Sequence, residues 1–159
     1  MMDGFFTWDL LLKTAFAFFA SVPFAVMLKI NKRHLLLAGI GAIVTYFFYS
    51  LMLALLSSYF AAAFVSTAAA VIYAEILARA RKAPAIIYIL VAVIPTVPGG
   101  ELYYTMRYLI MKEMDLCLEK LTAALEIGLG IAGGIVTASI LFGIFFDIYK
   151  SIKKSIANK

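Results

Sequence analysis

The chain has 159 residues, of which 65% are hydrophobic and only 14% are charged, and its formal net charge is +5. Its mean hydropathy is +1.01. A soluble domain has about 45–50% apolar and about 25% charged residues. This composition therefore excludes a soluble enzyme and a disordered chain, and it predicts an integral membrane protein that lies almost entirely inside the bilayer.

Several kinds of site are excluded by counts of single residue types. Cys117 is the only cysteine and His34 the only histidine, so an internal disulfide or a Cys/His metal cluster cannot form. The sequence has no Gly-Lys-Ser/Thr phosphate-binding loop, so ATP cannot drive a transport step from within this chain. We expect no cofactor and no nucleic-acid partner, because the positive charge is typical of cytoplasmic loops in membrane proteins.

The first span is expected at residues 10–28. A secretory signal peptide fits this region poorly, because Asp3 and Asp9 stand where a basic segment is needed. Within the span, Lys13 is expected to extend its ammonium group to the near interface.

The next apolar run, residues 35–77, contains no formal charge except Glu75. As one helix it would be roughly 65 Å long, against about 30 Å of hydrocarbon, so it must fold back. The polar cluster Ser57-Ser58-Tyr59 predicts the turn, with the second span at 35–56 and the third at 60–78. Glu75 and Arg79 lie one helical turn apart, and an interfacial ion pair is the favoured interpretation of them over a transport role.

The fourth span, residues 85–97, is short and ends in Pro95-Thr96-Val97-Pro98-Gly99-Gly100. Apolar residues at helical spacing predict an amphipathic segment at 101–120, followed by the fifth span at 121–146. We therefore expect an all-α, polytopic membrane protein. It would form a single transmembrane domain over residues 1–159, with about five helices, a broken fourth span and an amphipathic segment before the fifth.

Loop charges predict the orientation. The loops around residues 29–34 and 79–82 and the tail from residue 147 carry most of the Lys and Arg residues. We therefore expect a multi-pass protein of the inner (cytoplasmic) membrane with these basic segments in the cytoplasm. This places the N-terminus outside and the C-terminus inside, which requires an odd number of spans.

The break after the fourth span is the strongest local signal for a site. Pro95 and Pro98 remove backbone donors and interrupt a helix, while Gly99 and Gly100 permit turns that other residues enter only at a cost. A short hydrophobic segment interrupted by Pro and Gly is typical of substrate sites in transporters, where free amides at a helix start suit a carboxylate. A plain loop at the membrane surface is the alternative interpretation.

The residues from Val93 to Met106 carry a resemblance to the threonine/serine exporter family. Pro95, Pro98, Gly99 and Tyr103 match its Pro-x-x-Pro-Gly pattern with a following tyrosine, whereas Glu101 replaces an expected small residue. More narrowly, the chain resembles the five-span C-terminal half of these exporters, which also occurs as a separate small subunit. Over the rest of the chain, the resemblance lies in the five spans, the basic loops and the chain length, and few individual residues match.

The resemblance implies a secondary exporter of threonine/serine-type amino acids, or of dicarboxylates such as succinate, driven by an ion gradient and paired with a larger subunit. Substrate-binding candidates are Pro95, Pro98, Gly99, Gly100, Glu101 and Tyr103. Tyr103 has a second interpretation as an aromatic residue of the membrane interface.

Glu126 is a candidate for coupling to a proton or to a substrate ammonium group, because ionisable residues inside a membrane are functional by default. Its helix face continues through Gly130, Gly134 and Thr137, which would line a path. Alternatively, Glu126 lies at the outer interface and the two glycines only pack helices. A non-transporting scaffold subunit and a homo-oligomer also remain open, whereas an intramembrane enzyme is disfavoured because no catalytic constellation is visible.

Overall fold

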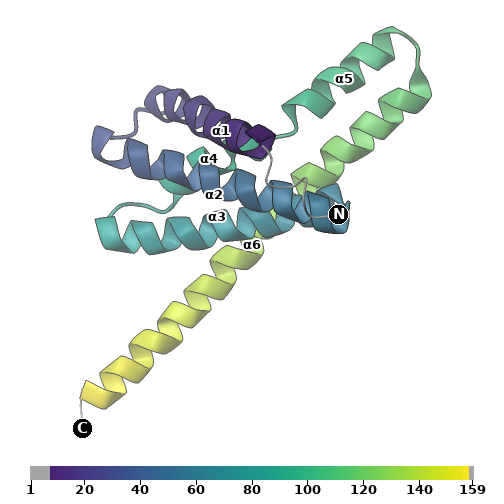
Figure 1. Cartoon of the computed structure of the whole chain (residues 1–159). Helices are drawn as coiled ribbons and strands as arrows, with labels where there is room; N and C mark the ends of the chain where they lie inside the picture. Colours follow the sequence, from purple (N-terminus) through teal and green to yellow (C-terminus); the bar gives the residue numbers. More distant parts are fainter. Residues whose placement is uncertain (1–7, 158–159) are drawn as a thin grey trace.

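The structure, a computed structural model, describes residues 8–157, and it contains no strand within that range. Figure 1 shows a bundle of helices, with a hairpin and a long final helix extending beyond it. This confirms the all-α class expected from the sequence. The elements are α1 (Trp8–Met27), α2 (Lys32–Leu56), α3 (Tyr59–Arg81), α4 (Ile86–Val93), the 3-10 turn η1 (Ile94–Thr96), α5 (Gly99–Ile110) and α6 (Met114–Ala157).

Four helices, α1, α2, α3 and α6, are long and apolar enough to cross a bilayer. The segment formed by α4 and η1 is long and apolar enough only together with α5. This segment and α5 are bent by 45° relative to each other at the break between them. The expected broken span is therefore present, and the described chain has five spans when the bent pair is one of them.

The turn between α2 and α3 lies at the polar pair Ser57–Ser58. Ser57 ends α2 in the left-handed conformation, with φ of 49°, and its N–H donates to the carbonyl of Leu53. Ser58 begins α3 by accepting a hydrogen bond from the N–H of Ala61 at 3.4 Å. Both helix ends thus have partners for backbone groups that would otherwise be unsatisfied.

The segment 101–120 is divided between two helices and does not form one amphipathic helix. Lys112 adopts φ of 60°, the left-handed conformation that ends helices, just after α5. α6 then begins at Met114, before the expected residue 121, and continues past the expected residue 146. α5 and the first turns of α6 therefore form the hairpin that projects from the bundle in Figure 1.

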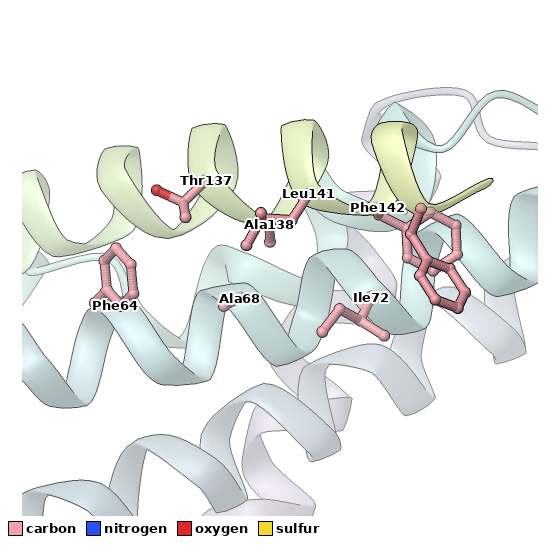
Figure 2. A pocket seen from close by; sticks show the side chains of 8 residues that line it. Phe64, Ala68, Ile72, Thr137, Ala138, Leu141 and Phe142 are labelled. Atoms are coloured by element: carbon pink, nitrogen blue, oxygen red, sulfur yellow. The ribbon is translucent and has the colours of Figure 1, made fainter. Parts of the chain in front are cut away.

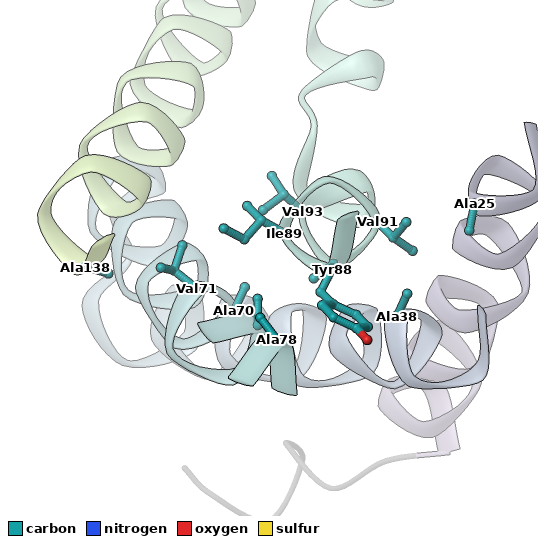
Figure 3. Close-up of a cluster of buried hydrophobic side chains, with 12 residues drawn as sticks. Ala25, Ala38, Ala70, Val71, Ala78, Tyr88, Ile89, Val91, Val93 and Ala138 are labelled. Atoms are coloured by element: carbon teal, nitrogen blue, oxygen red, sulfur yellow. The ribbon is translucent and has the colours of Figure 1, made fainter. Parts of the chain in front are cut away.

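The core surrounds α4. Figure 3 shows Tyr88, Ile89, Val91 and Val93 of this helix directed toward small residues of its neighbours. Alanine dominates these facing positions, which lets the helix backbones approach closely without a larger side chain between them. The buried cluster consists of Ala25, Ala38, Ala70, Val71, Ala74, Ala78, Tyr88, Ile89, Val91, Ala92, Val93 and Ala138.

Two tyrosine hydroxyls form hydrogen bonds between α2 and the helices beside it. The Tyr88 hydroxyl forms a hydrogen bond with Nδ1 of His34, at the start of α2. The Tyr73 hydroxyl of α3 donates to the carbonyl of Leu37 at 2.7 Å. The end of the bundle that carries His34 therefore also carries the start of α4, which brings the two predicted basic loops to the same end.

α6 packs along α3, and the two helices run parallel. An added Cβ at Gly130 would lie 2.6 Å from the carbonyl oxygen of Phe60, and one at Gly134 would lie 2.6 Å from that of Phe64. At the other end of α3, the guanidinium of Arg79 lies 4.3 Å from the ring centre of Phe146. Close contact between the helices thus depends on glycine at the early positions.

Candidate functional site

The site expected from the sequence is the break between α4 and α5. Pro95 lies in the single 3-10 turn η1, Val97 is extended with ψ of 129°, and Pro98 precedes α5. The hydroxyl of Thr96 donates to the carbonyl of Val93 at 2.8 Å and so satisfies an acceptor at the end of α4. Because the two prolines lack an N–H, the helix of α4 cannot continue directly into α5.

Gly99 and Gly100 form the first turn of α5 with ordinary backbone geometry. Neither has a positive φ, so the expectation that they provide a turn inaccessible to other residues is wrong, and the bend lies at the prolines. A Cβ added at either glycine would meet nothing within 4 Å. Their missing side chains therefore leave the backbone at the start of α5 open to an approaching molecule.

An open groove of about 300 Å³ lies where α1 and α2 meet the break. Its lining includes Lys13 of α1, Tyr46 of α2 and Pro95 of η1. Small and aromatic residues of α1 complete the lining: Phe16, Ala17 and Ala20. The groove thus combines an apolar wall with two polar side chains at the interrupted span, which is the general form of a small-molecule site.

Glu101, in the first turn of α5, is half-buried. It is not among the residues that line the groove at Pro95. Tyr46 and Tyr49 lie three residues apart on α2 and so share one face of that helix. Tyr49 therefore lies next to the groove residue Tyr46 on α2.

Tyr103 is not brought to this groove. It lies two positions after Glu101, which places the two side chains on nearly opposite sides of α5. Its side chain is 65% exposed and lines a separate groove of about 260 Å³. The residues that share this second groove are Met106, Arg107, Ile110 and Met111.

Glu126 is exposed on α6, before the part of the helix that packs on α3. The positions one and two turns later, Gly130 and Gly134, are filled by the backbone of α3. Their role in this chain is therefore helix packing, which is the alternative that the sequence left open for this stripe. The structure does not join Glu126 to the groove at Pro95.

A further groove of about 570 Å³ lies between α3 and α6. Figure 2 shows Phe64 of α3 at the end of this groove near Thr137 of α6, and Ile72 of α3 at the other end near Leu141 and Phe142. A groove with so few polar groups offers little to a charged metabolite, since such a ligand would lose its hydration without compensation. The groove at Pro95 differs from it in having Lys13 and Tyr46 in its lining and in lying at the interrupted span.

Lys13 and Tyr46 are residues of this groove that sequence reasoning did not select. Lys13 is the only charged residue among residues 10–27, and a charge inside an apolar span marks a candidate functional residue. From the sequence we expected only that its ammonium group reaches the interface. Its contact with the break depends on how α1 packs against α2 and η1, which no local pattern in α1 specifies.

Metal-ligating chemistry finds no support in the described residues, among which no group of three or more His, Cys, Asp or Glu side chains lies together. The comparison with known proteins gives a family instead. Residues 13–141 match the family model described as threonine/serine exporter, ThrE. No curated protein and no solved structure matches the chain. Because the family match covers most of the sequence, including α1 through most of α6, the chain is a membrane-embedded transport protein that belongs to the threonine/serine exporter family.

Proposed function

We propose that the chain is one subunit of a secondary exporter of threonine/serine-type amino acids, driven by an ion gradient and most simply by protons. The observation that carries this proposal is the polar groove at the interrupted span, lined by Lys13, Tyr46 and Pro95. Interrupted helices at membrane depth are tolerated only inside protein or beside a water-filled cavity, which is where a transported metabolite passes.

The proposed binding site is the broken backbone of Pro95, Pro98, Gly99 and Gly100. The open amides at the start of α5 attract the substrate carboxylate, because the positive end of the helix dipole points there. Glu101 follows them directly and takes the substrate ammonium group.

Two further residues are assigned to this pathway, Tyr103 because of the family resemblance and Glu126 because of its charge. Tyr103 points away from the groove within this chain, so in this proposal it contacts substrate from the side of a larger subunit. Glu126, exposed on α6, carries the coupling proton.

The proposed setting is the cytoplasmic membrane, with the N-terminus outside and the C-terminus inside. Basic residues of two loops lie at one end of the bundle, since His34 contacts Tyr88 next to the loop that contains Arg81 and Lys82. Clusters of Lys and Arg favour the cytoplasmic side.

A dicarboxylate exporter of the succinate type and a scaffold subunit are the rival functions. A scaffold needs helix faces of small residues that are free for a partner, but α3 already packs against Gly130 and Gly134. They are therefore not free to hold a partner.

Export of labelled threonine, serine and succinate from cells tests the proposal. Cells that express this chain, a candidate larger subunit of the same family, or both are compared. We expect efflux of threonine and serine that needs both proteins and collapses when a protonophore removes the gradient. Succinate efflux in place of threonine efflux would favour the dicarboxylate function, and no efflux with both proteins present in the membrane would favour the scaffold.

A further inference from the structure

The groove of about 570 Å³ between α3 and α6 has the lining that an acyl chain requires. Its small residues are Ala68 and Ala138, and Thr137 is the only polar residue among those that line it. Ile72 and Phe145, on its two walls, are exposed, so the groove opens away from the core of the bundle and toward the bilayer. A hydrocarbon chain fills such a groove without leaving any polar group unsatisfied.

The groove leads to the basic end of α3, where Arg79, Arg81 and Lys82 lie. Phe64, at its far end, lies about four helical turns before Arg79, or about 22 Å along the helix, against about 30 Å of hydrocarbon. Ile72 lies about two turns before Arg79, or about 10 Å. The groove therefore runs from just beyond the middle of the membrane toward the surface at which α3 ends.

Arg79 places a cation directly beside the groove. Its guanidinium lies 4.6 Å from the ring centre of Phe142, which lines the groove, and 4.3 Å from that of Phe146. Its hydrogen bonds to the carbonyl and the carboxylate of Glu75 both use Nη1. A guanidinium carries five N–H donors in a planar fork, so the donors on its other nitrogens suit a phosphate.

Two lysines continue this face of α6 beyond the groove. Lys150 lies one turn after Phe146, and Lys153 lies three turns after Phe142, so both project from the side of α6 that carries these rings. Both lysines are exposed. The carboxylate of Asp147 does not compensate them at this site, because Asp147 lies about 140° around the helix from Phe142. The surface end of the groove is therefore cationic on both helices.

We propose that the groove between α3 and α6 binds an anionic phospholipid of the cytoplasmic leaflet. One acyl chain lies in the groove, and the phosphate pairs with Arg79, Lys150 and Lys153. Basic pockets between transmembrane helices on the cytoplasmic side suit anionic head groups, which an apolar groove alone does not select. This lipid site lies outside the proposed transport pathway and rests only on the orientation proposed for the chain.

The same charges disfavour a second copy of the chain as the occupant. All copies insert in one orientation, so two such grooves placed face to face would bring Arg79, Lys150 and Lys153 of both copies to the same membrane surface. Like charges placed opposite one another across an interface oppose association. An anionic lipid neutralises this end of the groove instead.

Quenching of a tryptophan in the groove by brominated lipids tests the proposal. Trp8 is the only tryptophan of the chain, so Phe142→Trp in a Trp8→Phe background reports on the groove alone. The purified full chain is reconstituted in phosphatidylcholine vesicles that contain increasing amounts of brominated phosphatidylglycerol or, as the neutral probe, brominated phosphatidylcholine. Because each cation near an anionic lipid contributes about fivefold in affinity, half-maximal quenching should need about tenfold less of the anionic lipid.

Two double variants of equal charge separate the groove from the basic surface around it. Lys150→Gln with Lys153→Gln removes two cations at the groove and should lower the preference for the anionic lipid at least fivefold. Lys29→Gln with Lys32→Gln removes two exposed cations from the same end of the bundle but outside the groove, and should leave the preference unchanged. Arg79 is retained in both, because its loss would leave the carboxylate of Glu75 unpaired.

The thermal unfolding midpoint shows that each variant is folded. Equal quenching by the two brominated lipids would mean that the groove holds ordinary bilayer lipid, and it would overturn the proposal. An equal loss of preference in both double variants would overturn it as well, since general surface charge would then account for the effect. Absence of quenching by either lipid would place protein, such as a second copy, over the groove and would also overturn it.

Discussion

At Gly130 and Gly134, the size of a single side chain decides how closely α6 approaches α3. A methyl group at either position would lie 2.6 Å from a carbonyl oxygen of α3, which is backbone and cannot rotate away. Other glycines of the same helix differ, because a Cβ at Gly128 or Gly143 would meet nothing within 4 Å. The helix therefore offers matched pairs of the same substitution in crowded and open surroundings.

We predict that Gly130→Ala and Gly134→Ala destabilise the protein, while Gly128→Ala and Gly143→Ala do not. Overpacking costs about 1–3 kcal/mol. Replacing glycine by alanine at an open helix position gains about 0.5–1 kcal/mol. Cys117, the only cysteine, is buried in α6, so the rate at which a thiol-reactive dye labels it during heating reports unfolding. A lower thermal unfolding midpoint for all four variants, or for none, would contradict this account of how α6 packs on α3.

Much of the element pattern could be predicted, because spans in this chain are separated by polar residues. Ser57 and Ser58 interrupt a long apolar run, and the turn lies there because their side chains and backbone complete the helix ends. The division of the segment 101–120 could not be predicted in the same way. Lys112 ends α5 in a left-handed conformation that glycine usually adopts, so the sequence carries no turn signal at that position.

The candidate site could be predicted only in part, because its residues come from several helices and not from one local motif. The motif at Pro95 and Pro98 is local, and the break that it predicts is present. Lys13 and Tyr46 come from two other helices, and their place in the groove depends on tertiary packing. Tyr103 belongs to the motif in sequence, but the phase of α5 turns it away from the groove.

The bend between α4 and α5 gives a prediction at the level of the element. With Pro95→Ala and Pro98→Ala combined, every N–H needed for a continuous helix is present, so the 45° bend should decrease. Spin labels at Leu90 and Met106, both exposed, should then lie farther apart in pulsed electron resonance measurements. Threonine export should fall at the same time, because the groove loses its edge at Pro95.

Pro84→Ala is the matched control for this double variant, since Pro84 is exposed in the turn before α4. It should change neither the distance nor the export rate. An unchanged distance in the double variant would mean that tertiary packing, and not proline, sets the bend.

The parallel packing of α3 and α6 determines the path of the whole chain. Gly130 contacts Phe60 at the start of α3, while Phe146 contacts Arg79 near its end. Because both helices cross in the same direction, the chain between them must return from one end of the bundle to the other. α4, η1 and α5 make this return, so the bent pair is a span and not a loop that re-enters from one side.

This argument predicts which residues each side of the membrane can reach. In a chain with Cys117→Ala, single cysteines at Ser57 and Lys112 should react with an impermeant thiol reagent added to intact cells. Single cysteines at Lys82 and Ser151 should react only after the membrane is permeabilised, because the basic loops face the cytoplasm in the proposed orientation. If Lys112 and Lys82 were labelled from the same side, the bent pair would not cross. That result would contradict the parallel arrangement of α3 and α6, because the contacts of Gly130 with α3 and of Arg79 with α6 place the two ends of the bent pair at opposite surfaces.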